Sequence, residues 1–76
     1  MISLKGIIIP VNWDKSGNVL SVAIATRDED EYLIEDQGLA EKLKSLLRKE
    51  VEVSGIVQRK SGKKIIKIKQ WRCQNA

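Results

Sequence analysis

The sequence predicts an all-β domain with one helix, whose strands curl into a small closed sheet. Two neighbouring stretches carry this prediction. Residues 39–47 place leucines and an alanine on one face of a 3.6-residue period, which is typical of an amphipathic helix. Residues 51–57 then switch to apolar–polar alternation, which is typical of a half-buried strand. Apolar runs separated by polar turns fill the rest of the 76 residues, so we expect further strands around this helix.

The first two strands are expected to form a hairpin. Met1–Trp13 carries apolar residues on both faces, and Pro10, which lacks an amide donor, indicates an edge or a break in the pairing. Residues 13–18 contain Ser-Gly-Asn, which tolerates positive φ and predicts a turn. Val19–Arg27 follows as the second strand. Its core face is expected to carry Leu20, Val22 and Ile24, and its other face the small residues Ser21, Ala23 and Ala25.

The middle of the chain combines an acidic turn, a short strand and the helix. Asp28–Glu31 lacks the alternating spacing and the glycine of a calcium loop, so a solvated turn is the favoured interpretation. Tyr32–Glu35 is the third strand. Asp36 is expected to cap the helix, because its carboxylate can accept a hydrogen bond from an amide of the first turn. About three turns of helix follow, with Arg48 and Lys49 near the negative end of the helix dipole.

The last part of the chain predicts two strands joined by a basic turn. Gly55 interrupts the fourth strand, which indicates a bulge or a sharp bend of the kind that lets a small sheet close. Gln58–Lys64 is expected to be the turn, Ile65–Trp71 the fifth strand, and 72–76 a frayed polar tail. Within the fifth strand we expect one face to carry Ile66 and Ile68, and the other Ile65, Lys67, Lys69 and Trp71.

Strand, strand, strand, helix, strand, strand is the element order of a known family. On residues 4–6, 32–36, 43–46 and 51–57, the chain resembles the oligonucleotide/oligosaccharide-binding (OB) fold. It is similar in pattern to the small stand-alone bacterial members and to anticodon-binding domains. The resemblance implies a five-stranded Greek-key barrel, capped at one end by the helix, that forms a single domain over residues 1–76. Another small barrel, such as an SH3-like one, is the alternative, but it has no natural place for the helix.

The composition argues against an enzyme. The chain has no His, the commonest general base and metal ligand, and Cys73 has only Arg72 beside it as an activating group. One Cys without His excludes the usual zinc sites, and no glycine-rich phosphate loop is present, so we expect no cofactor and no metal. A single Cys cannot form an intrachain disulfide, and no leader or long apolar run is seen. We therefore expect a cytoplasmic protein that does not enter a membrane.

Charge is distributed unevenly along the chain. Residues 1–52 hold seven Lys/Arg and ten Asp/Glu, a net −3, whereas residues 53–76 hold seven Lys/Arg and no acid, a net +7. A basic stripe favours a polyanionic partner, and OB-fold proteins usually bind single strands between the two turns that carry cations here. We therefore expect weak, non-sequence-specific binding of single-stranded RNA or DNA. Phosphates would contact Lys15, Arg59, Lys60, Lys63, Lys64, Lys67 and Lys69, and bases would stack on Trp13 and Trp71.

Other features favour a different interpretation. Trp13, Tyr32 and Trp71 are also typical of barrel packing, and lysines on a strand also protect a sheet edge from aggregation. The small residues of the second strand stack no base, and the acidic turn would repel phosphate. The alternative function is a protein-interaction or self-association module, in which the acidic and basic turns dock as opposite poles on a partner or on another copy.

Overall fold

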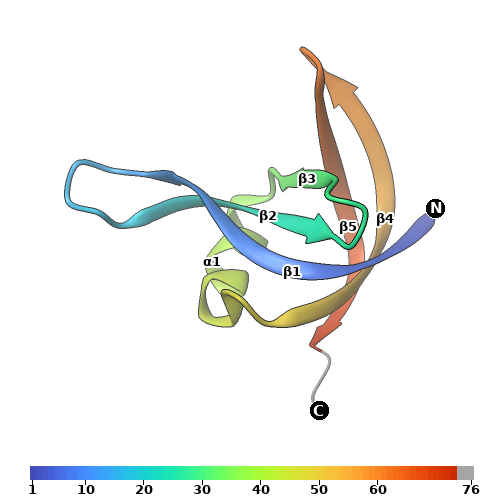
Figure 1. The fold of residues 1–76 in the computed structure, drawn as a ribbon, viewed down its shortest axis with the longest axis horizontal. Coiled ribbons are helices and arrows are strands. Elements are labelled where there is room, and N and C mark those ends of the chain that lie inside the picture. Colours follow the sequence, from blue (N-terminus) through green and yellow to red (C-terminus); the bar gives the residue numbers. More distant parts are fainter. Residues whose placement is uncertain (74–76) are drawn as a thin grey trace.

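The structure is a closed barrel of five strands with one short helix (Figure 1). The computed structural model describes residues 1–73. Its elements are β1 (Ile2–Trp13), β2 (Val19–Thr26), β3 (Glu31–Ile34), α1 (Gln37–Leu43), the 3₁₀ turn η1 (Lys44–Leu46), β4 (Glu50–Lys60) and β5 (Lys63–Cys73). The strands close in the order β1-β2-β3-β5-β4, with β3 parallel to β5 and β4 returning to β1. The predicted barrel, with its helix between the third and fourth strands, is confirmed.

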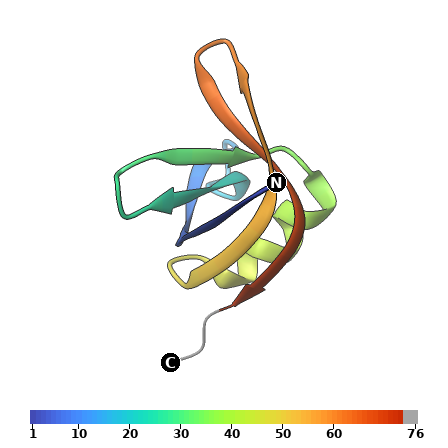
Figure 2. The ribbon, with the colours of Figure 1, turned by 90° about the vertical axis from the view of Figure 1, so that its right-hand side faces the viewer.

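The core is aliphatic and lies between the barrel strands and α1. Its fully buried members are Ile8, Val22, Ile24, Ile34, Ala40, Leu43, Val51, Val53 and Ile66. Ala40 and Leu43 come from α1, so the predicted apolar stripe of the helix covers the interior of the barrel (Figure 2). Burial of each large aliphatic side chain contributes roughly 1.5–3 kcal/mol. Within residues 1–73 no polar or charged residue is buried, so all charged chemistry lies at the surface.

The helix starts as predicted and ends earlier. The carboxylate of Asp36 accepts the amide of Leu39 at 3.1 Å, which confirms the predicted N-cap. The α-helix ends at Leu43, and after the 3₁₀ turn Arg48 adopts a φ of +67°. Its amide donates to the carbonyl of Ile8 at 2.8 Å, because the chain must turn here to bring β4 beside β1. The prediction that Arg48 lies in the last helical turn is therefore wrong, as is the same prediction for Lys49.

A bulge near Gly55 changes the face of β5. Gly55 pairs with Ile68 and Ser54 pairs with Gln70, so Lys69 is an extra residue in β5. The predicted irregularity at Gly55 is confirmed, and a Cβ at this position would overlap the carbonyl of Lys67. Because one residue is inserted, the side-chain alternation shifts after Lys69. Trp71 consequently packs against the core, on the face of Ile66 and Ile68, and its predicted place beside Lys67 is wrong.

The β1–β2 hairpin contains two further irregularities. Register shifts after Pro10 and after Asn12 leave Val11 and Leu20 as extra residues, one in each strand. The predicted break near Pro10 is therefore confirmed. The second shift moves Leu20 off the core face, and its side chain is 48% exposed. The prediction that Leu20 lies on the core face beside Val22 is therefore wrong.

The β4–β5 hairpin is longer than predicted. Both strands continue through the stretch expected to be a turn, and only Ser61 and Gly62 connect them, with φ values of 51° and 79°. Two left-handed residues in succession match the right-handed twist of paired strands, which explains the tight connection. At the other end, Arg72 and Cys73 belong to β5 and pair with β4, so the predicted tail does not begin at Arg72. Its last three residues, 74–76, lie outside the described residues.

Candidate nucleic-acid interface

The end of the β4–β5 hairpin brings four predicted phosphate-binding residues together. The hairpin extends past the barrel on the side where β1 no longer accompanies β4 (Figures 1 and 2). Across its ladder Arg59 faces Lys64, and Lys60 faces Lys63. Two like-charged pairs therefore lie next to each other beside the turn. Directly opposed like charges destabilise a hairpin, so these two cross-strand pairs do not themselves stabilise the fold.

The four cations divide between the two faces of the hairpin. Ile66 points into the core, and alternation along β5 places Lys64 on the same face and Lys63 on the opposite one. Their cross-strand partners follow, with Arg59 beside Lys64 and Lys60 beside Lys63. A polyanion that wraps the hairpin would meet positive charge on either side.

Lys64 is partly engaged within the molecule. Its ammonium lies 2.8 Å from a carboxylate oxygen of Asp30 and 5.4 Å from the ring centre of Tyr32. The lysine side chain is only 29% exposed, so this contact orders it against the barrel. No ion pair engages the other three hairpin cations anywhere in residues 1–73. We therefore regard Lys64 as the hairpin cation least available to a phosphate.

An open groove of about 510 Å³ runs beside the hairpin over the outer face of β2 and β3. We call it the outer groove, and it combines apolar side chains with three carboxylates and two lysines: Val11, Ala23, Leu33, Glu29, Asp30, Glu31, Lys63 and Lys64. The predicted small residues Ser21 and Ala23 of the second strand line this groove. The carboxylates make the groove itself unfavourable for phosphate, so the cationic surface is confined to its hairpin side.

A second groove, of about 400 Å³, lies between α1 and β5 and brings Trp71 together with two lysines. We call it the helix groove. Lys69 was predicted as a phosphate contact, whereas Lys42 of α1 was not singled out in the sequence. Lys42 lies one helical turn from Leu39, which lines the same groove, and only the fold shows that this side of the helix reaches β5. Trp71 is half-buried, which leaves part of its indole for contact.

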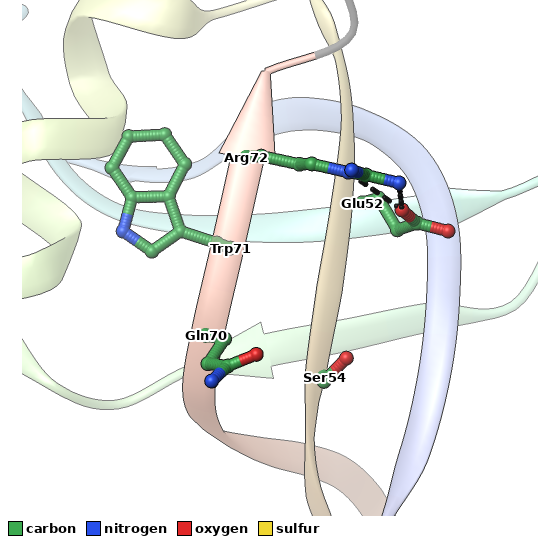
Figure 3. A pocket seen from close by; sticks show the side chains of 5 residues that line it. All are labelled: Glu52, Ser54, Gln70, Trp71 and Arg72. Atoms are coloured by element: carbon green, nitrogen blue, oxygen red, sulfur yellow. Dashed lines mark hydrogen bonds and ion pairs between the residues drawn. The ribbon is translucent and has the colours of Figure 1, made fainter.

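The opposite face of β5 is occupied by an ion pair. Arg72 lies 2.6 Å from the carboxylate of Glu52, whereas the indole of Trp71 points away from both (Figure 3). These residues line a pocket of about 260 Å³ together with Ser54 and Gln70. Here one acid neutralises one cation, whereas the helix groove has two lysines and one carboxylate, that of Asp36, so this pocket offers less to an anion than the helix groove does.

The remaining predicted residues lie apart from these grooves. Trp13 and Lys15 lie at the far end of the β1–β2 hairpin, and Trp13 is 55% exposed. The β1–β2 hairpin leaves the barrel in another direction from the β4–β5 hairpin (Figure 1). Lys67 is exposed opposite Ile56, at the base of the β4–β5 hairpin. The nine predicted residues therefore form four separate groups, one of them Lys67 alone, and not one continuous surface.

The turn next to Lys15 is held by a carboxylate. Asp14 accepts the amides of Ser16 at 2.8 Å and Asn18 at 2.9 Å, and the side chain of Asn18 at 3.2 Å. The Asn18 amide, followed by its side chain, holds the pKa of Asp14 below its ordinary value. The negative charge of Asp14 offsets the positive charge of Lys15, so this end of the molecule attracts anions less than the other hairpin does.

Other kinds of site are not seen in residues 1–73. No three His, Cys, Asp or Glu side chains gather in an arrangement that could hold a metal ion. Within the same residues, no helix has the length and apolar character needed to cross a membrane. Comparison of the chain with protein-family models, curated proteins and solved structures finds no match.

Proposed function

We propose that the protein binds single-stranded RNA or DNA without sequence specificity, through the cations of the β4–β5 hairpin. The observation that carries this proposal is the pair of adjacent like-charged contacts beside the turn, Arg59 with Lys64 and Lys60 with Lys63. Each opposed pair costs roughly 0.2–1 kcal/mol of stability relative to neutral residues. A phosphate chain offsets this repulsion and releases counterions, which is the main source of non-specific affinity.

The fold and the helix groove support the same function. The strand order, with β3 parallel to β5, is compatible with the OB-like barrel that the sequence resembles. The half-buried indole of Trp71 lines the helix groove together with Lys42 and Lys69, and it can stack one base while the ammonium groups contact neighbouring phosphates. Trp13 with Lys15, and Lys67 on the hairpin base, are weaker contributors, since each lies apart from the main cationic cluster.

Fluorescence anisotropy with labelled single-stranded oligomers tests the proposal. Measurements at about 50 and 200 mM salt should show affinity that falls steeply with salt. The triple variant Arg59→Gln/Lys60→Gln/Lys63→Gln removes the unpaired hairpin cations and should lose most of the binding. The matched control Lys5→Gln/Arg27→Gln/Lys49→Gln removes the same charge from exposed positions elsewhere and should retain it. Folded protein that binds no oligomer at the lower salt would refute the proposal.

The outer groove favours a second candidate, self-association. Its three carboxylates, at residues 29–31, and its apolar lining suit the cationic hairpin of another copy better than they suit phosphate. Light scattering distinguishes the two functions. Self-association predicts a mass that rises with protein concentration at low salt and is unaffected by an oligonucleotide, whereas nucleic-acid binding alone predicts a constant monomer mass without the oligonucleotide.

A further inference from the structure

One edge of β4 has no neighbouring strand over its last five residues. The pairing of β1 with β4 ends at Ile2 opposite Gly55, and residues 56–60 pair with β5 alone among the described residues. Figure 1 shows the N-terminus of β1 beside the middle of β4, with the rest of β4 continuing past it. The outward backbone amides and carbonyls of this segment therefore face solvent, and such an edge is a template for an added strand.

The side chains on this edge indicate which strand it accepts. Ile56 is 46% exposed at the start of the segment and supplies an apolar contact on the outer face. Arg59 and Lys60 follow at its end, with Lys63 across the ladder. The same edge of a second copy would bring only positive charge and no acidic residue, so charge disfavours a second copy here. A strand with acidic residues has the complementary charge.

We propose that residues 56–60 of β4 bind an extended acidic segment of another protein as an additional strand. Main-chain hydrogen bonds along the edge provide the affinity. Ile56 and Arg59 lie on opposite faces of β4, because side chains alternate along a strand, so together they select a segment in which apolar and acidic residues alternate. This site is distinct from phosphate binding, because it requires backbone donors in the ligand as well as negative charge.

The test uses a short labelled peptide of alternating valine and glutamate, and the same peptide N-methylated at every residue. The two carry equal charge, but the methylated peptide has no amide donors. The unmethylated peptide should bind at least about tenfold more tightly, and it should slow hydrogen exchange within residues 56–60. Equal binding of the two peptides, no binding of either, or protection confined to another strand would overturn the proposal.

A protein variant separates this site from the nucleic-acid surface. Ile56→Ser removes the exposed apolar contact without touching the core, so the barrel should remain folded by circular dichroism. The variant should bind the valine–glutamate peptide with an affinity about fivefold lower or more. Its affinity for a single-stranded oligonucleotide should be unchanged. An equal loss of affinity for the peptide and for the oligonucleotide would contradict a separate site, because it would show that both ligands bind the same charged surface.

Discussion

The two long hairpins of this protein hold their turns in different ways. The β1–β2 turn has backbone hydrogen bonds and a left-handed Gly17, and the carboxylate of Asp14 adds hydrogen bonds from residues 16 and 18. The β4–β5 turn is closed by backbone conformation, with left-handed residues at Ser61 and Gly62. The first hairpin balances its lysine with an acid, whereas the second opposes cation to cation. Because the β4–β5 turn is held without an acidic side chain, the positive charge beside this turn is not offset within the turn itself. The β4–β5 hairpin is therefore suited to an anionic ligand.

The largest expected effect comes from breaking the base of the cationic hairpin. A Cβ at Gly55 would overlap the carbonyl of Lys67, and backbone on both strands must move to admit it. Gly55→Ala should lower the free energy of unfolding by roughly 2–3 kcal/mol in urea titrations. Gly38→Ala is the control, because its Cβ would meet only Asp36 at 3.5 Å and alanine favours a helix. A Gly55→Ala protein as stable as the control would show that the strands are not closely packed there.

Much of this architecture is visible in the sequence because it depends on local periodicity. Alternation through Val51 and Val53, and the capping carboxylate at Asp36, each specify their own element. The shift of Trp71 to the core face is not visible, since it depends on an inserted residue that only the opposite strand reveals. The contact of Lys64 with Asp30, and the groove that Lys42 and Lys69 both line, likewise require the closed barrel. The sequence identifies each cationic residue, but it does not show which of them lie side by side in the folded barrel.

Removing the opposed cations should increase stability. In Lys60→Gln/Lys63→Gln one like-charged pair becomes neutral, so the free energy of unfolding should rise by about 0.5–1 kcal/mol at low salt. Added salt should erase the difference, because screening weakens the repulsion in the parent protein. Thermal unfolding at two ionic strengths measures both effects. A less stable variant would mean that these lysines support the fold, and would weaken the case for a ligand.

A substitution in the β4–β5 turn should give a smaller gain in stability. Asn tolerates the left-handed conformation better than Ser and is preferred before Gly in such turns, so Ser61→Asn should stabilise the protein by roughly 0.5 kcal/mol. Ser16→Asn, in the other turn, should give no gain, because Ser16 is not among the residues with positive φ. Urea unfolding of both variants checks the contrast. Equal gains in stability would show that the positive φ of Ser61 is not the cause of the effect.

The smallest expected effect is the pH dependence of the stability that Asp14 gives to the β1–β2 turn. The pKa of Asp14 is lowered by its hydrogen bonds to Asn18, so its carboxylate stabilises the fold above the unfolded pKa of 3.8. That contribution is lost as the pH falls through the lowered folded value. The melting temperature of Asp14→Ala should therefore lie below that of the parent at pH 7, and the gap should narrow in strong acid. If the difference in melting temperature does not change with pH, the effect of Asp14→Ala comes from packing and not from the charge of Asp14.

The salt dependence of oligonucleotide binding tests the role of the cationic hairpin most directly. Each phosphate neutralised on a single strand contributes about 0.7 to the slope of log affinity against log salt concentration. Arg59→Gln/Lys60→Gln/Lys63→Gln should therefore reduce the magnitude of that slope by about 2 relative to the parent, while the Lys5→Gln/Arg27→Gln/Lys49→Gln control leaves it unchanged. An identical slope for all three proteins would contradict phosphate binding by the β4–β5 hairpin.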